Sequence, residues 1–374
     1  ANGLMERLGI SHEMHDRILF VIRNHLEMSR YANKFDLDDP EVIDSFAQFI
    51  EGEQRLRFLY VHTFCDANAT APDLWNDHKE ELHTQLFINT LNVLEGKHAR
   101  KDPSSLKNAY SEIAVEGVPQ EELIDHLEQV PERYFSHAGK EEVALHVQMV
   151  NRFKNNLGDS SKPVLSWRND VRRSLTIVDI VTRDRPALFE KIAGGFSVAG
   201  LNILGARAVT RKDGIAIDVF YVEGEKGGIV KDSKIRELCE SSIHAFLENE
   251  TSPDKLISEK RKKTDSTRLF SNEDRLGERI PPSVDVYHDV SLSRIIVEVR
   301  AADQVGLLHL IAKTISRCGF SIQFARVATE QEIATDVFNI EMSDDNKSFS
   351  PSQFLKLREE LNESLNAGKY YLEV

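Results

Sequence analysis

Hydrophobic residues recur with helical spacing through the first quarter of the chain. Ile18, Leu19, Ile22 and Leu26 share one helical face, and a second run of this kind extends over 42–50. That run follows an Asp-Asp-Pro-Glu segment at 38–41, which is typical of a capped helix with proline in its first turn. Helices are also expected over 55–64 and 75–94. The pattern therefore predicts an all-helical domain over residues 1–95.

The next part of the chain is more polar and keeps helical spacing in only two stretches, 119–130 and 140–153. A loop is expected over 155–163. We therefore expect residues 96–165 to form a helical connector.

The hydrophobic period changes from 3.6 to 2 at Ser174. Residues 175–181 alternate and are rich in strand-forming residues, which predicts a strand, and 186–199 is expected to be an amphipathic helix. Strands over 201–210 and 215–222 are expected to pair as a hairpin, followed by a second helix over 230–247 and a strand over 283–287. This is the order βαββαβ. A polar insertion over about 250–282 precedes the last strand, and its basic run Lys260–Lys263 is expected to be a solvated loop rather than a docking site.

The same unit then occurs a second time. Asp184–Leu188 returns as Asp303–Leu307, followed at the same spacing by a Gly, an Asn-Ile or Ser-Ile pair and an Ala-Arg pair, and then by an Ala-X-Asp-Val-Phe run. The spacing changes only where four residues, 211–214, are replaced by three, 330–332, as expected in a hairpin turn. The second copy predicts strands over 293–300, 320–329, 333–342 and 369–374 and helices over 307–318 and 351–365. The sequence thus predicts two tandem α+β modules, 174–289 and 293–374, and such a duplication suggests sensing more than catalysis.

The turn after the first strand of each module is a candidate ligand site. N–H groups in the first turn of a helix have no partner within the helix and can hold a carboxylate. Asp184 and Asp303 lie in this turn and could either cap the helix or accept a hydrogen bond from the α-ammonium of an amino acid. Gly306 would let a ligand approach the backbone closely, whereas Gly200 and Gly319 need only left-handed geometry at helix ends.

The two copies read D-R-P-A-L-F followed by G-L-N-I, and D-Q-V-G-L-L followed by G-F-S-I. They resemble the ACT domain family, whose signature is D-R-P-G-L-L. The resemblance implies ferredoxin-like domains that bind small molecules, commonly amino acids. The first copy departs from the signature at Ala187 and the second at Gln304-Val305, so one copy could be chiefly structural. The resemblance implies ligand contacts from the turn of one copy and a strand of the other: Asp184, Ala187, Leu188, Asn202, Ile203, Asp303, Gly306, Leu307, Ser321 and Ile322.

Composition narrows the classes of function. A formal net charge of −14 disfavours nucleic acid as a partner. No apolar run approaches the roughly 18 residues of a membrane-spanning helix, and no signal-peptide core follows the N-terminus, so a cytoplasmic protein is expected. The three widely spaced cysteines have no metal-type spacing and no even count for a disulfide framework. The sequence does not begin with Met, and we expect it to be a chain truncated at its front.

The helical domain offers two candidate catalytic and metal-binding residues, His25 and Asp66. An imidazole and a carboxylate from two helices could hold a divalent metal that activates water against a phosphodiester. By residue type alone, a surface or capping role explains them better.

Four further segments carry a second resemblance: R-N-H-L-E-M-S, then D-L-D-D-P-E-V-I, then L-R-F-L-Y-V-H-T-F-C-D-A-N-A-T-A-P-D-L-W-N, and P-E-R-Y-F before H-V-Q-M-V. Together with the tandem ACT pattern they resemble the C-terminal half of the bifunctional uridylyltransferase/uridylyl-removing enzymes that act on the PII nitrogen-signalling protein. In that family an HD-type domain removes UMP from a PII tyrosine with Mg²⁺ or Mn²⁺, and glutamine bound to the ACT domains favours removal over addition. The resemblance implies that residues 1–95 are the second half of an HD domain with His25 and Asp66 as metal ligands. It also implies that the UTP-using nucleotidyltransferase domain lies upstream, and it leaves Asn68 where the family commonly has Arg.

Two alternatives stay open. A non-catalytic amino-acid sensor would regulate a partner by binding alone, and a metal-dependent nucleotide phosphohydrolase related to alarmone enzymes would usually carry one ACT copy. The segment His12–Asp16 also contains a His-Asp pair, but it leads directly into the helix of His25, whereas the family's metal pair lies on a separate, earlier helix.

Overall fold

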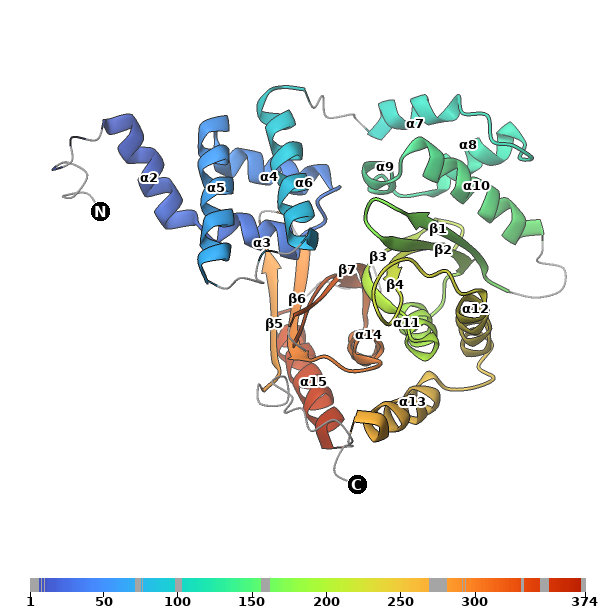
Figure 1. Ribbon diagram of the computed structural model, residues 1–374. Coiled ribbons are helices and arrows are strands. Elements are labelled where there is room, and N and C mark those ends of the chain that lie inside the picture. Colours follow the sequence, from blue (N-terminus) through green and yellow to red (C-terminus); the bar gives the residue numbers. More distant parts are fainter. Residues whose placement is uncertain are drawn as a thin grey trace. The chain divides into compact units, whose positions relative to one another are not determined.

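The computed structural model describes residues 7, 9, 11–70, 75, 77–97, 103–155, 162–268, 281–290, 292, 294–330, 333–343 and 350–370. The chain divides into two compact units, Ala1–Asn108 with Phe135–His137, and Ala109–Tyr134 with Ala138–Val374. The described part of the first unit is helical, and the described strands belong to the second (Figure 1). No helix among these residues is long and apolar enough to cross a membrane.

The helices expected in the first unit are confirmed as α2 (His12–Asn24), α4 (Pro40–Ile50), α5 (Glu53–Thr70) and α6 (Asp77–Leu94). The helices α3 (Glu27–Lys34) and α7 (Pro103–Ser111) were not predicted. Asp39 caps α4 by accepting from the backbone N–H of Glu41 at 2.9 Å, and Pro40 occupies the first turn as predicted. Met28 and Phe46 are fully buried in the core that these helices share. Residues 71–74, between the helices expected over 55–64 and 75–94, lie outside the described residues.

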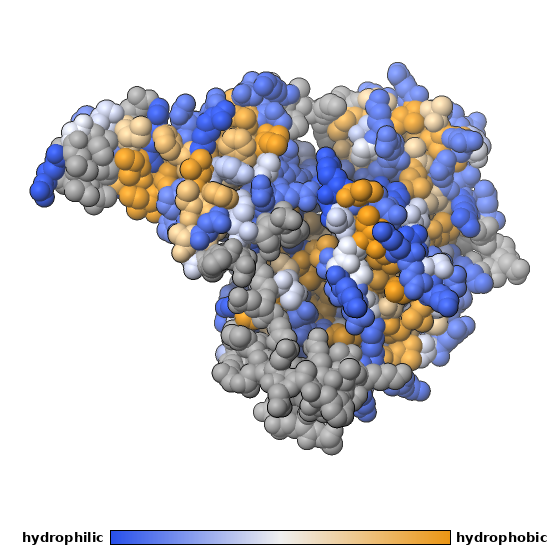
Figure 2. All heavy atoms as spheres, in the orientation of Figure 1, coloured by the Kyte–Doolittle hydropathy of each residue, from blue (hydrophilic) through white to orange (hydrophobic). Residues whose placement is uncertain are grey.

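Part of the apolar pattern of this unit faces outward. Ile22 on α2, Leu26 just after it, and Val61 and Phe64 on α5 are between 44% and 63% exposed. Figure 2 shows apolar side chains gathered over α2 and α5. Exposed apolar patches on a soluble fold are typical of surfaces that another chain segment or a partner covers.

The described residues of the second unit form an eight-stranded antiparallel sheet in the order β1-β2-β4-β3-β7-β8-β6-β5. Its strands are β1 (Val164–Asp170), β2 (Leu175–Arg183), β3 (Asn202–Thr210), β4 (Ile215–Glu223), β5 (Ser283–Asp289), β6 (Arg294–Ala302), β7 (Phe320–Glu330) and β8 (Ile333–Met342). Counted outward from the β3–β7 pair, the first half has the order β3-β4-β2-β1 and the second half has the matching order β7-β8-β6-β5. Each half carries an irregularity at the matching place, between Ile203 and Gly205 and between Ile322 and Phe324. The duplicated sequence therefore folds into a duplicated structure.

The edge strand of each half differs from the predicted βαββαβ order. The strand expected over 283–287 exists as β5, but it pairs with β6 of the second copy and not with β2 of the first. β1, which the sequence analysis missed, takes the equivalent place beside β2. Residues 369–370 end helix α15 (Pro351–Tyr370) instead of forming a strand, and 371–374 lie outside the described residues. Each copy thus receives its edge strand through a short hairpin that precedes it, which needs less loop closure than a strand arriving from the far end of the module.

Four helices pack on one face of this sheet: α11 (Leu188–Ala199), α12 (Ser233–Leu247), α14 (Leu307–Arg317) and α15 (Figure 1). Val178, Phe196 and Ile311 belong to the single buried core between them and the strands. α11 and α14 pack against each other, which joins the two copies through helices as well as strands. On the opposite face, α10 (Lys140–Asn155) packs on β1 and β2. α8 (Gln120–Gln129) packs against α10, and the short helix α9 (Tyr134–His137) lies between them in the sequence. α8 and α10 confirm the two helices expected in the connector.

The polar insertion is a helix over much of its length, where the sequence analysis expected a loop. α13 spans Pro253–Arg268 and includes the basic run. Lys260 is not solvated in a loop, because its ammonium donates to the carbonyl oxygens of Ser197 and Val198, both at 3.1 Å. These carbonyls end α11, where a positive charge is favoured by the helix dipole. Residues 269–280 of the insertion lie outside the described part.

Candidate functional site

The candidate metal ligands of the helical unit lie on α5 and at the end of α2. His25 follows α2 with its Nδ1 atom 3.1 Å from the carbonyl oxygen of Ile22, and its ring faces that of His62 at 5.9 Å between centroids. Asp66 lies one turn beyond His62 on α5 and is exposed. The structure thus brings His25 to His62, a residue the sequence analysis missed, whereas Asp66 is not joined to His25 by a hydrogen bond or ion pair in the described part of the chain. The buried Nδ1 atom of His62 has no hydrogen-bond partner among the described residues.

The pair in the segment His12–Asp16 is arranged differently. The rings of His12 and His15 meet edge to face at 6.4 Å between centroids, and Nε2 of His15 is buried without a hydrogen-bond partner among the described residues. Neither this pair nor His25 with Asp66 belongs to a set of three ligand atoms that lie within 4.8 Å of one another in the described part of the chain.

One such set does occur, in the second unit: Glu142 and His146 of α10 with Asp179 of β2. Arg168 of β1 already donates to both carboxylate oxygens of Asp179 at 2.7 Å and contacts Glu142 at 3.5 Å. Burial alone would raise the pKa of Asp179, but the hydrogen bonds from His146 and Arg168 lower it. The ligand types could hold a metal, yet the guanidinium supplies the positive charge that a metal would bring, so the arrangement is that of a buried ion-pair network.

A continuous hydrogen-bond chain leads from this cluster to the β3–β4 turn. The Arg211 guanidinium donates to Nδ1 of His126 at 3.0 Å, which leaves the His126 Nε2 proton facing the Tyr134 hydroxyl at 3.3 Å. That hydroxyl lies 2.8 Å from Nδ1 of His146, whose Nε2 lies 3.2 Å from Asp179. With the proton of each ring on Nε2, every link of this chain joins one donor to one acceptor. Burial first, and then the charge of Arg211, hold the pKa of His126 well below its usual value, in agreement with the neutral form.

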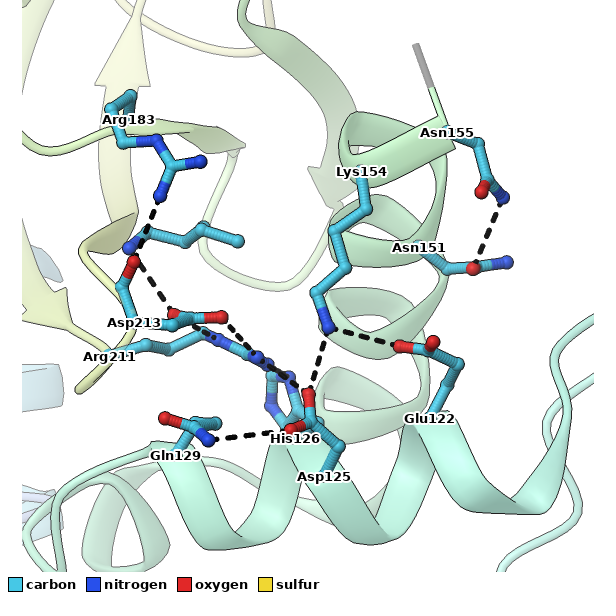
Figure 3. Close-up of polar contacts among 11 residues, drawn as sticks. Glu122, Asp125, His126, Gln129, Asn151, Lys154, Asn155, Arg183, Arg211 and Asp213 are labelled. Atoms are coloured by element: carbon cyan, nitrogen blue, oxygen red, sulfur yellow. Dashed lines mark hydrogen bonds and ion pairs between the residues drawn. The ribbon is translucent and has the colours of Figure 1, made fainter. Parts of the chain in front are cut away.

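Arg211 is also the centre of an ion-pair cluster that Figure 3 shows. Its guanidinium is buried and donates to Asp125 of α8 at 2.9 Å and to Asp213 of its own turn at 2.8 Å. Lys154 of α10 donates to Asp125 at 2.8 Å and to Glu122 at 3.1 Å. The β3–β4 turn is therefore fastened to the connector helices by charge-assisted bonds. The cluster could not be predicted from the sequence because its members come from three separate segments.

The same β3–β4 hairpin holds the first candidate ligand turn. The backbone N–H of Asp184 donates to the carbonyl oxygen of Gly214 at 2.9 Å, and its carboxylate accepts from the Thr210 hydroxyl at 3.0 Å. α11 begins after Ala187 without a side-chain cap, so Asp184 does not act as a helix cap. Ala187 has φ 65°, the left-handed conformation that Gly306 adopts with φ 80° in the second copy. Alanine there costs about 1 kcal/mol relative to glycine.

The remaining predicted ligand residues divide into buried and accessible side chains. Leu188, Leu307, Ile203 and Ile322 are at most 7% exposed and belong to the core, so only their backbone groups can meet a ligand. Asn202 is exposed and Ser321 is half-buried. The antiparallel pairing of β3 with β7 brings the start of β7, with Ser321, toward the end of β3 and the Asp184 turn. By the same symmetry, Asn202 lies toward the Asp303 turn.

Two buried acids lie behind these turns. Asp218 of β4 and its counterpart Asp336 of β8 are 3% and 1% exposed. Burial, and next the nearby charge of Asp184, raise the pKa of Asp218 to about 8. Burial and then Asp303 raise the pKa of Asp336 well above its usual value. The signal was present in the sequence, because an acid interrupts an apolar strand at the same place in both copies, but the sequence analysis used it only to mark the repeat.

No model of a known protein family matches the chain. The chain is 28% identical over 381 residues to the bifunctional uridylyltransferase/uridylyl-removing enzyme of Caulobacter vibrioides, a match covering 99% of this chain and 38% of that protein. It is 29% identical over 369 residues to the protein of the same name from Rhodospirillum rubrum, covering 98% and 38%. With the protein of that name from Ralstonia nicotianae, identity is 31% over 356 residues, covering 93% and 40%. The resemblance to the bifunctional uridylyltransferase/uridylyl-removing enzymes is confirmed, and the chain spans about two fifths of the length of these relatives.

Proposed function

We propose that this chain is the regulatory and partly hydrolytic portion of an enzyme that transfers UMP from UTP to the PII protein and removes it again. The observation that carries the proposal is the similarity to enzymes of that name over 99% of the chain. Supporting it, a helical unit is followed by connector helices and a duplicated sheet. We assign residues 1–95 to an HD-type half domain, 96–165 to the connector, and 174–289 and 293–374 to two ACT domains. The pairing of β5 with β6 favours moving 283–289 into the second ACT domain and adding β1 to the first.

The proposed hydrolytic site contains His25 and Asp66, to which the geometry adds His62. The unpartnered Nδ1 atom of His62 is a donor suited to a divalent metal, and it lies on the face of α5 that continues to Asp66. Imidazole ligands favour Mn²⁺ or another transition metal over Mg²⁺. Such a metal would supply a water of lowered pKa at neutral pH. The relatives are longer than this chain, and the exposed apolar face of α2 and α5 is a surface that further helices of an HD-type domain would bury.

The hydrolytic assignment is tested in an enzyme that contains this chain together with its nucleotidyltransferase domain. His25→Ala and Asp66→Ala should abolish release of UMP from uridylylated PII while transfer from UTP continues. His12→Ala, which changes an exposed histidine of the neighbouring segment, is the matched control and should keep both activities. Unchanged UMP release in both site variants would contradict the assignment.

We propose glutamine as the ligand of the ACT turns. The N–H groups at the start of α11, which no side chain caps, suit an α-carboxylate, and Asp184 with the buried Asp218 behind it suits an α-ammonium. Saturating glutamine at 100 times Kd should stabilise the sheet unit by about 2.7 kcal/mol. Calorimetry should show heat with glutamine and none with Asp184→Ala. Heat with another amino acid but none with glutamine would reject this ligand.

The alternative is a non-catalytic amino-acid sensor that regulates a partner by binding alone. The sensor alternative predicts that neither uridylyl removal nor metal binding depends on His25 or Asp66, so the activity assay above separates the two functions.

A further inference from the structure

Helix α13 covers the candidate ligand turn of the second copy. Ile257 is buried against Gly306, where an added Cβ atom would lie only 2.5 Å from Cγ2 of Ile257. The Arg261 side chain donates through Nε to the carbonyl oxygen of Val305, in the same turn, at 2.6 Å. The close approach that Gly306 permits is therefore used by the protein itself.

α13 is fastened to both copies of the module. At its start, the Asp254 carboxylate accepts from His309 Nε2 at 3.2 Å and from Lys313 Nζ at 2.7 Å, both on α14. One turn and a half further on, Lys260 donates to the carbonyls that end α11. Pro253 lies against Gly194 of α11, where a Cβ atom would approach it to 2.8 Å. The helix thus lies across the junction of α11 and α14 that borders the second turn.

Ala187 of the first turn is half-buried, whereas its counterpart Gly306 in the second turn is buried under α13. The carboxylate-bearing residues Asp184 and Asp303 are both exposed. The chemistry of the covered turn is nevertheless retained, because Asp336 lies behind Asp303 as Asp218 lies behind Asp184. Oδ1 of Asp336 is buried without a hydrogen-bond partner among the described residues. The two turns therefore differ mainly in what lies above them.

We propose that α13 is an intramolecular lid that closes the ligand turn of the second copy, so that an amino acid binds only at the first. The proposal rests on the proposed function for the nature of the ligand, but the lid itself is a property of the fold. Its release would open a second site with the same pair of acids. The stretch that joins the copies would then set how many ligands the chain senses.

Calorimetry with glutamine on the whole chain tests the lid. The unmodified chain should bind one equivalent, lost in Asp184→Ala and kept in Asp303→Ala. Ile257→Ala combined with Arg261→Ala should bind two equivalents. Lys255→Ala combined with Lys262→Ala changes exposed residues of the same helix and should leave one. Two equivalents in the unmodified chain, loss of binding in Asp303→Ala, or one equivalent in the Ile257/Arg261 variant would each overturn the proposal.

Amide hydrogen exchange gives a readout that needs no ligand. In the Ile257/Arg261 variant, amides over 304–310 should exchange about tenfold faster or more while those over 185–191 stay unchanged, because only the second turn loses its cover. Gly306→Ala, which forces Ile257 away, should give the same result by a change in the turn itself. Unchanged exchange in both variants would overturn the lid even where glutamine binds. Faster amide exchange in the variants, together with no heat of glutamine binding in calorimetry, would reject glutamine as the ligand but support α13 as a lid.

Discussion

Replacing Asp218 by asparagine should stabilise the sheet unit by an amount that grows with pH. The folded protein holds the pKa of this buried carboxyl at about 8, against roughly 3.9 in an unfolded chain. Between these values the folded state keeps a proton that the unfolded state has released, so stability falls as pH rises and the loss is complete above pH 8. At about 1.4 kcal/mol per pKa unit, wild-type Asp218 destabilises the fold by on the order of 4 kcal/mol at pH 7. The Asp218→Asn variant lacks this contribution.

Urea unfolding at pH 5–8.5 measures the effect. The chain has two tryptophans, so a Trp75→Phe background leaves Trp167 of β1 as the fluorescent reporter of the sheet that contains Asp218. The difference in unfolding free energy between this background and the same background carrying Asp218→Asn should widen by roughly 3–5 kcal/mol across this range. Asp184→Asn removes the neighbouring charge that raises the pKa of Asp218, so the pH range over which the difference widens should end at a lower pH. A difference that stays constant from pH 5 to 8.5 would refute the reasoning, because it would show that Asp218 is already ionised or unburied.

Two further changes probe the turn and the hydrogen-bond chain. Ala187→Gly should stabilise the unit by about 0.5–1 kcal/mol by removing the left-handed penalty, measured by the same urea unfolding; a loss of stability would show that the methyl group packs usefully. Tyr134→Phe should cost about 1–3 kcal/mol because His126 and His146 each lose a buried partner, and a thermal shift near zero would argue against the chain of bonds. Burial and Arg211 hold the pKa of His126 below its usual value, so its contribution to the free energy of unfolding should be intact above about pH 6.5 and lost as pH falls further. His126→Asn should therefore weaken the fall in stability below this pH. An unchanged fall in stability would contradict this explanation.

Periodicity predicted the elements that are decided locally. α4 begins at its Asp-Pro cap and buries one face, and the β3–β4 hairpin joins two neighbouring apolar runs through a short turn. Gly200 and Gly319 adopt the left-handed conformation expected from the ends of their helices. Such features depend on residues within a few positions of one another, so the sequence contains the information in readable form.

Elements whose stability comes from distant partners were harder to predict. α13 is too polar to show a clear apolar face, and its helix is held by Ile257 against Gly306 and by Lys260 on α11. β1 and β5 are edge strands, and nothing in their own residues tells which half of the sheet they join. The ion pairs of Arg211 combine residues from α8, α10 and a hairpin turn.

The sequence by itself determined that the chain contains a helical unit and two copies of one α+β module, and it carried the family resemblance that its relatives confirm. Repetition and period are one-dimensional properties, so they survive without coordinates. Only the tertiary structure decided that the two copies form one continuous sheet, that His25 meets His62, and that a helix packs on the candidate ligand turn of the second copy. These facts depend on which surfaces meet once the chain is packed, and burial and charge pairing between segments far apart in sequence decide that.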